Sequence, residues 1–186
     1  GYNWENNYSN AGEDWHNSSD TNIGDITDGA GYAARRLSDT CTKYNVPYKI
    51  TTLQMAGYVA ADKSGTVSEA EAAPSSRWNA VKFKKDTALS LEPDLTDNAV
   101  YMDEYVNYIV QTLGDASNST GMQGYSLDNE PVLWNDTHPR LHGEEVSNSE
   151  LLSKSIELAS VVKSIDPKAE VFGPAFWGML PCINGS

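Results

Sequence analysis

Basic residues are scarce in this chain. Its 186 residues include 13 Lys and Arg but 26 Asp and Glu, which gives a formal net charge of −13 at pH 7. A surface of this sign repels the phosphates of nucleic acids and the headgroups of anionic lipids. The composition therefore argues against nucleic-acid and membrane-surface binding. It favours a neutral partner, such as a polysaccharide, or a cation.

Long apolar runs and nucleotide-binding motifs are also lacking. A membrane-spanning helix needs about 20 predominantly apolar residues in a row, and the sequence has no such run. No G-x-G-x-x-G or G-x-x-x-x-G-K-S/T pattern follows a predicted strand, which disfavours a nucleotide site. No signal peptide is visible and the chain opens without methionine. We therefore interpret it as a mature or trimmed chain.

Cysteine occurs only twice, at Cys41 and Cys182. The two residues are either two buried thiols or one disulfide, and a disulfide is sensible only outside the cytosol. The sequence leaves both alternatives open.

The composition is that of a globular protein, and predicted helices and strands alternate along the chain. Apolar residues make up 39% and aromatic residues 10%, enough for one domain with a core. Helical spacing of apolar residues predicts three helices, which begin at Asp28, near Thr96 and at Ser147. Ser147 and Glu150 form an S-x-x-E capping box. Apolar and β-branched runs predict three strands, over 48–55, 122–131 and 169–178.

The intervening segments are predicted to be mostly loops. Residues 1–27 are rich in turn-forming residues and too polar for a core element, so we expect a long loop that presents aromatic side chains. Residues 62–75 and 89–98 read as acidic loops, and residues 75–83 are expected to form one or two helical turns.

The alternation of helices and strands predicts an α/β fold with parallel strands joined by right-handed crossovers. The strands read as continuous apolar runs, as expected when both faces of a sheet are covered. A doubly wound sheet and a (β/α)8 barrel both fit this order. In both architectures the functional site lies at the carboxyl ends of the strands.

Each predicted strand runs into polar and aromatic residues at its carboxyl end. These tips read "QMAGYV", "DNEPVLW" and "GPAFWG". Flat aromatic rings stack on sugar rings, and carboxylates and amides bind hydroxyl groups. The strand tips therefore indicate a carbohydrate site.

Glu130 is the leading catalytic candidate because it follows the middle predicted strand. A retaining glycosidase uses two carboxyl groups about 5–5.5 Å apart, one as acid/base and one as nucleophile. Asn129 is suited to hydrogen-bond the sugar 2-OH, and Pro131 stiffens the turn that aims the glutamate. The alternative is a helix start with Asp128 or Asn129 as cap, Pro131 at the first helical position and Glu130 incidental.

Five long blocks occur in order along nearly the whole chain. They are "GYNWENNYSNAGEDW", "LQMAGYVAADKSGTVSEAEAAPSSRWN", "PDLTDNAVYMDEYVNYIV", "GYSLDNEPVLWNDTHPRLH" and "DPKAEVFGPAFWG". These blocks resemble glycoside hydrolase family 44, which is similar to the large clan of (β/α)8 retaining glycosidases.

The resemblance implies an endo-acting, retaining hydrolase of β-1,4-glucans, such as cellulose, carboxymethyl cellulose and xyloglucan. Glu130 matches the family's acid/base, and Asn129 matches the clan's sugar-binding asparagine. Residues 1–186 would be a fragment of one TIM-barrel catalytic domain, roughly strands 3 to 5 with their helices, without a second domain. The nucleophile, a second glutamate at the tip of strand 7, would lie outside this chain.

Such a reaction requires no cofactor, and its partner is the β-glucan substrate. A three-strand piece of a barrel leaves two strand edges unpaired and the interior face uncovered, so we expect it to need the remaining barrel segments. Two alternatives stay open: a non-catalytic remnant that binds glucan through its aromatic tips, and an inactive fragment.

Three tryptophans are further substrate-binding candidates. Trp4 either stacks on a sugar, which its polar surroundings favour, or packs within its loop. Trp177 at the third strand tip is a weaker case of the same kind. Trp134 fits packing under the Glu130 loop as well as contact with substrate.

Two more groups of residues were considered as metal sites. Asp94 and Asp97, with Glu71, are oxygen-rich loop residues suited to a structural calcium ion, as family members resembling this chain can carry. The alternative is that Asp97 caps the next helix. His138 and His142 lie four residues apart, but Pro139 interrupts the helix that a metal pair would need, so a solvated or loop-structuring role is favoured.

Overall fold

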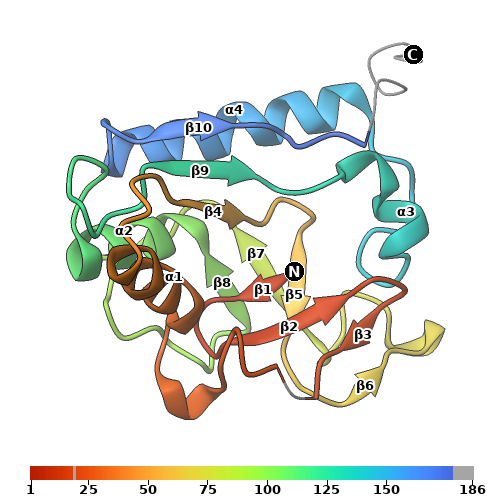
Figure 1. Cartoon of the computed structure of the whole chain (residues 1–186). Helices are drawn as coiled ribbons and strands as arrows, with labels where there is room; N and C mark the ends of the chain where they lie inside the picture. Colours follow the sequence, from red (N-terminus) through yellow and green to blue (C-terminus); the bar gives the residue numbers. More distant parts are fainter. Residues whose placement is uncertain (19, 178–186) are drawn as a thin grey trace.

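A three-stranded parallel sheet organises the molecule. The computed structural model describes residues 1–18 and 20–177 (Figure 1). The sheet has the order β10-β9-β4, and both pairs are parallel. Its strands are β4 (Ile50–Leu53), β9 (Gly124–Leu127) and β10 (Glu170–Phe172). The three predicted strands and their parallel pairing are confirmed. The described residues do not close a barrel.

The helices alternate with these strands as predicted. They are α1 (Tyr32–Lys43), α2 (Met102–Leu113), α3 (Trp134–Thr137) and α4 (Asn148–Ile165), with 3-10 turns η1 (Ile26–Asp28), η2 (Glu69–Glu71) and η3 (Pro131–Leu133). Ser147 caps α4, since its side chain accepts a hydrogen bond from the Glu150 amide. None of the helices in residues 1–18 and 20–177 has the length and hydropathy that a membrane crossing requires.

Two of the predicted helix starts were wrong by several residues. Asp28 closes the short turn η1, for which Asp25 is the cap, and α1 begins only at Tyr32. The helix expected near Thr96 begins at Met102 because residues 99–101 form strand β8 (Ala99–Tyr101). Before each helix, hydrogen bonds to other segments hold the backbone: the Gly31 amide donates to the Trp4 carbonyl, and residues 99–101 pair with β7.

A second sheet has the order β5-β7-β8 and includes a segment that was predicted to be helical. Its other strands are β5 (Tyr58–Ala60) and β7 (Trp78–Lys82). β7 pairs antiparallel with β5 and parallel with β8. The expected helical turns over 75–83 are therefore wrong, because strand partners on both sides bind this backbone.

The N-terminal region is folded into the core and is not a loop. It contributes three strands to a sheet of order β1-β2-β3-β6, namely β1 (Tyr2–Asn3), β2 (Tyr8–Ala11) and β3 (Trp15–His16), with β6 (Gly65–Thr66). Several of its buried polar side chains are hydrogen-bonded to the backbone of other segments, as burial of an amide requires. Asn3 donates to the Ala60 carbonyl at 3.0 Å, and Asn7 donates to the Gly29 carbonyl at 2.8 Å.

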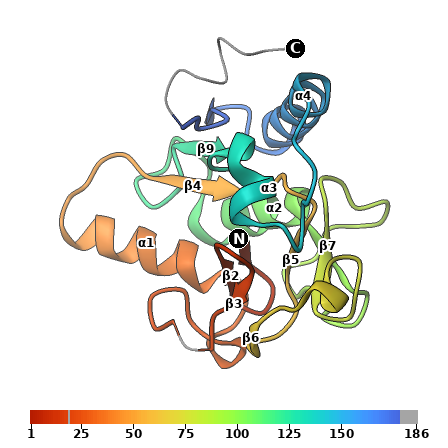
Figure 2. The same cartoon turned by 90° about the vertical axis from the view of Figure 1, so that its right-hand side faces the viewer.

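The parallel sheet has one covered face and one exposed face. Leu53, Tyr125 and Leu127 are buried in the main core with residues of α2 and α4, which lie together on one side of β4 and β9 (Figure 2). On the other face Ile50 is 44% exposed and Phe172 is 40% exposed. The strands therefore alternate, which corrects the expectation that both faces are covered within this chain.

Cys41 is buried on α1. The question of its pairing with Cys182 lies outside the described residues, as does the end of the strand predicted over 169–178.

Candidate active site

Glu130 lies at the carboxyl tip of β9, the central strand of the parallel sheet. Its amide donates a hydrogen bond of 2.7 Å to the Ala175 carbonyl, beyond the tip of β10. Its backbone is left-handed, with φ of 50° and ψ of 49°. Pro131 occupies the first position of η3, as the helix-start alternative requires. However, the cap position belongs to Glu130, and its side chain makes no capping hydrogen bond.

Asn129 precedes Glu130 and is exposed. It forms a parallel β-bridge with Ala175, which keeps the register of β9 and β10 three residues beyond their last pair, Ser126 and Phe172. The structure thus brings Asn129 and Glu130 together at one edge of the sheet, the edge at which α/β proteins place their sites.

Asp128 joins the tip of β9 to the tip of β4. Its Oδ2 accepts hydrogen bonds from the amides of Met55 at 2.6 Å and Ala56 at 3.1 Å. Its Oδ1 accepts from the Asn129 amide at 2.7 Å. Burial raises the pKa of Asp128, and these three N–H donors oppose the shift because they stabilise the carboxylate.

Trp134 packs beneath the Glu130 loop and has 2% of its surface exposed. The His142 ring lies 5.1 Å from it, centroid to centroid, and the Lys154 Nζ lies 5.4 Å from its ring centre. His142 is fixed in turn by Glu150, with 3.1 Å between Nε2 and Oε1. These contacts are those of a packed tryptophan, and His142 is held in place by its contacts with Trp134 and Glu150.

Trp4 is fully buried, which does not fit a sugar-stacking surface. Its ring stacks on Tyr105 with 5.2 Å between centroids, and its Nε1 donates to the Tyr101 carbonyl at 3.2 Å. Its contacts are those of a packed loop aromatic, because the whole N-terminal region folds inward. Trp177 differs, since it is 61% exposed and lies two residues after Ala175.

Each of the three calcium candidates has hydrogen-bond partners of its own. Glu71 pairs with Arg77 at 2.9 Å, and hydrogen bonds from Ser68 and Arg77 lower its pKa to about 2. Asp94 accepts hydrogen bonds from Thr96, and Asp97 accepts from the amide of Ala99 at 3.0 Å. Among residues 1–18 and 20–177, no three His, Cys, Asp or Glu side chains form a metal-binding group. The three candidate side chains are thus not gathered into one such group, and the calcium site stays a prediction.

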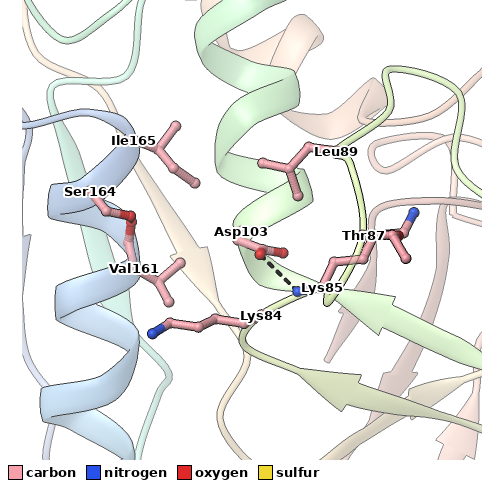
Figure 3. Close-up of a pocket in the computed structure, with 8 residues that line it drawn as sticks. All are labelled: Lys84, Lys85, Thr87, Leu89, Asp103, Val161, Ser164 and Ile165. Carbon is pink, nitrogen blue, oxygen red and sulfur yellow. Dashed lines mark hydrogen bonds between the residues drawn. The ribbon is translucent and has the colours of Figure 1, made fainter.

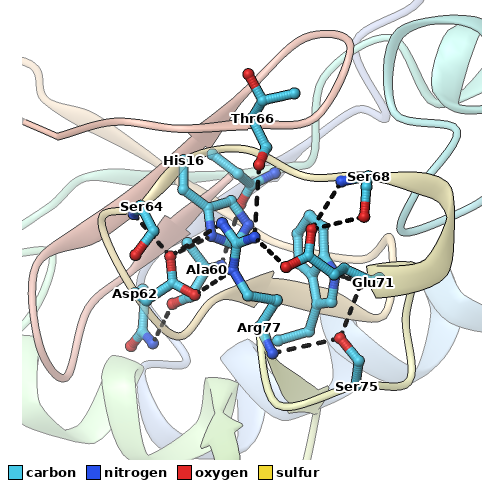
Figure 4. Close-up of polar contacts among 12 residues, drawn as sticks. His16, Ala60, Asp62, Ser64, Thr66, Ser68, Glu71, Ser75 and Arg77 are labelled. Atoms are coloured by element: carbon cyan, nitrogen blue, oxygen red, sulfur yellow. Dashed lines mark hydrogen bonds and ion pairs between the residues drawn. The ribbon is translucent and has the colours of Figure 1, made fainter.

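A partly buried ionic network that includes Glu71 joins segments on either side of β6 (Figure 4). Asp62 accepts from Arg77 and contacts His16, with 3.0 Å between its Oδ1 and His16 Nδ1. Burial opposes ionisation of Asp62, but Arg77, the Ser64 amide and His16 together lower its pKa to about 2. The His16 ring meets Trp78 edge-on at 4.5 Å. The network joins β3 to β7, and no spacing in the sequence signals it because the partners are far apart along the chain.

The structure also has a pocket of about 290 Å³ away from the strand tips (Figure 3). Its lining comes from the segment after β7 and from helices α2 and α4: Lys84, Lys85, Thr87, Leu89, Asp103, Val161, Ser164 and Ile165. Within this lining, Asp103 accepts a hydrogen bond of 2.8 Å from the Lys85 amide. The pocket contains none of the candidate site residues, so the strand tips remain the candidate active site.

Parallel strands alternating with helices define this chain as an α/β protein, and the polar side chains at the carboxyl ends of the strands form its candidate site. The chain belongs to glycoside hydrolase family 44, because the model of that family matches residues 8–186.

Individual relatives agree with this family. The chain is 54% identical, over 97% of its length, to "Beta-mannanase/endoglucanase A" of Caldicellulosiruptor saccharolyticus. It is 47% identical to Cel44A, a family 44 endoglucanase from Clostridium thermocellum, with a TM-score of 0.92 over 97% of this chain. It is 45% identical to a family 44 xyloglucanase from Paenibacillus polymyxa with xyloglucan, with a TM-score of 0.87 over 96% of this chain. The chain spans 14% of the first relative and 37% of each solved structure.

Proposed function

We propose that this chain carries the acid/base half of the active site of a retaining endo-β-1,4-glucanase. The observation that carries the proposal is the position of Glu130, at the tip of the central parallel strand with its side chain free of any capping role. Relatives named endoglucanase and xyloglucanase support β-1,4-glucans, including cellulose, carboxymethyl cellulose and xyloglucan, as the substrate class.

In the proposed architecture, β4, β9 and β10 are strands 3, 4 and 5 of a (β/α)8 barrel, and the chain is a fragment of that single domain. The exposed sheet face, with Ile50 and Phe172, supports this arrangement because it would form part of the barrel interior. The remaining barrel segments would cover that face. They would also supply the nucleophile, which this chain lacks.

In the proposed reaction Glu130 protonates the glycosidic oxygen as the leaving group departs, while the nucleophile attacks the anomeric carbon. Glu130 then removes a proton from the water that hydrolyses the glycosyl-enzyme. Asn129 hydrogen-bonds the sugar 2-OH, and Trp177 offers an exposed indole for stacking. The carboxylates of Glu130 and of the nucleophile suffice for this reaction without a cofactor. A polysaccharide substrate also supports a secreted, extracellular enzyme, because the polymer is too large to enter a cell.

The test is Glu130→Ala in the full-length enzyme that contains this chain. Loss of a general acid is expected to lower kcat/KM on polysaccharide by about 10²- to 10⁴-fold. Aryl cellobiosides with good leaving groups should lose much less in kcat/KM, because their departure needs no protonation. Glu145→Ala, which alters an exposed glutamate in a later loop, is the matched control and should behave as the parent. Unchanged hydrolysis of cellulose by the Glu130 variant would refute the role.

A glucan-binding remnant is the second candidate, and the exposed Trp177 at the strand tip favours it. Calorimetric titration of the chain with cello-oligosaccharides, combined with a reducing-end assay, separates the candidates. Binding without release of reducing ends would support the remnant, and neither binding nor release would indicate an inactive fragment.

A further inference from the structure

The backbone around Glu130 is held in a conformation that needs support. Both Asp128, with φ of 55°, and Glu130, with φ of 50°, lie in the left-handed region. Aspartate and asparagine enter this region readily, whereas for glutamate it is uncommon and costs free energy. Two such residues flanking Asn129 persist only where neighbouring structure determines the backbone.

That support comes from the neighbouring strands on both sides of β9. Toward β10, the Glu130 amide binds the Ala175 carbonyl and Asn129 bridges Ala175. Toward β4, the Asp128 amide donates to the Leu53 carbonyl at 2.9 Å, which continues the strand ladder by one residue. Past Leu53 the β4 backbone makes no further backbone hydrogen bond to β9. There the Asp128 carboxylate accepts the hydrogen bonds of the Met55 and Ala56 amides instead.

The two carboxylate oxygens of Asp128 bind different strands. Oδ2 binds the amides of Met55 and Ala56 at the tip of β4, and Oδ1 binds the amide of Asn129 on its own strand. One side chain thus ties the start of the Asn129–Glu130 segment to a different strand. Three N–H donors on two oxygens suit a carboxylate, since an amide side chain offers one oxygen and would set its NH₂ group against an N–H.

We propose that Asp128 is the positioning residue for Glu130. By bridging the tips of β4 and β9, its carboxylate fixes the location from which Glu130 meets the glycosidic oxygen. Asp128 acts through the backbone and does not touch the substrate. This inference rests on the proposed acid/base role of Glu130.

The test is Asp128→Asn in the full-length enzyme, with kcat/KM measured on aryl β-cellobiosides of graded leaving-group ability. Asparagine tolerates the left-handed backbone, so the variant changes the acceptor set and leaves the turn conformation permitted. A displaced acid lowers kcat/KM by about 10- to 100-fold for poor leaving groups. The kcat/KM on dinitrophenyl cellobioside, which has a good leaving group, should be nearly unchanged. Asp94→Asn is the matched control, because Asp94 also accepts two hydrogen bonds but only from Thr96 within its own loop.

The outcomes separate the two levels of the proposal. An equal loss for good and poor leaving groups would mean a merely structural role and would overturn the inference. Parent-like rates in the Asp128 variant, together with collapse in the Glu130 variant, would overturn the inference while the acid/base role stands. Parent-like rates in the Glu130 variant would overturn both. If circular dichroism shows that Asp128→Asn is unfolded, Asp128→Gly supplies the same test, since glycine permits the backbone without a carboxylate.

Discussion

Glu5 is a buried carboxyl group whose protonation should make folding pH-dependent. It is 4% exposed, and its Oε2 has no hydrogen-bond partner among the residues that the structure describes. Burial, followed by the negative charges of Asp97 and Glu104, raises its pKa to about 8, although Lys85 and a backbone hydrogen bond from Tyr101 act in the opposite direction. Glu5 is therefore protonated in the folded protein at neutral pH.

The sign of the effect follows from proton binding. Between the unfolded pKa, about 4.3 for glutamate, and the folded pKa near 8, the folded state binds more protons than the unfolded state, so stability falls as pH rises. Each unit of pKa difference corresponds to about 1.4 kcal/mol. From pH 5 to pH 7 the loss from this group is about 2 to 3 kcal/mol.

Glu5→Gln removes the titration and keeps a polar side chain of similar size. We expect the free energy of unfolding of the variant, relative to the parent, to increase by about 2 to 3 kcal/mol between pH 5 and pH 7. Urea unfolding of the full-length enzyme at pH 5, 6, 7 and 8 measures this difference. Glu157→Gln, on the exposed side of α4, is the control and should show no such trend. Parallel pH dependence of parent and Glu5 variant would refute the reasoning.

Two smaller changes test the helix cap and the exposed indole. Ser147→Ala removes the hydrogen bond from the Glu150 amide and should lower the free energy of unfolding by about 1 kcal/mol. Ser153→Ala, at an exposed position inside α4, is the control and should not lower it. Equal stability of the two variants would contradict the cap. Trp177→Ala should leave the melting temperature unchanged because the indole is 61% exposed. The same variant should bind cello-oligosaccharides more weakly, as measured by calorimetry, and undiminished affinity would exclude stacking.

The sequence alone was sufficient for the long elements and for the placement of Glu130 at the tip of a parallel strand. Helices α1, α2 and α4 are 12 to 18 residues long, so their apolar period repeats several times. The parallel strands follow from their alternation with these helices. Glu130 could be located because a glutamate directly after a buried strand depends only on local order along the chain.

Tertiary structure alone decided the short strands and the surroundings of each side chain. The strands of the other two sheets are two to five residues long, too short for a period, and β7 becomes a strand only because β5 and β8 bind it from both sides. Trp4 is buried through contacts with Tyr101 and Tyr105, far along the chain, whereas Trp177 is exposed. The same holds for the charges that act on Glu5 and for the hydrogen bonds that join Asp128 to Met55 and Ala56. Burial, pKa and positioning depend on neighbours in space, and in this chain the decisive neighbours are more than 70 residues away.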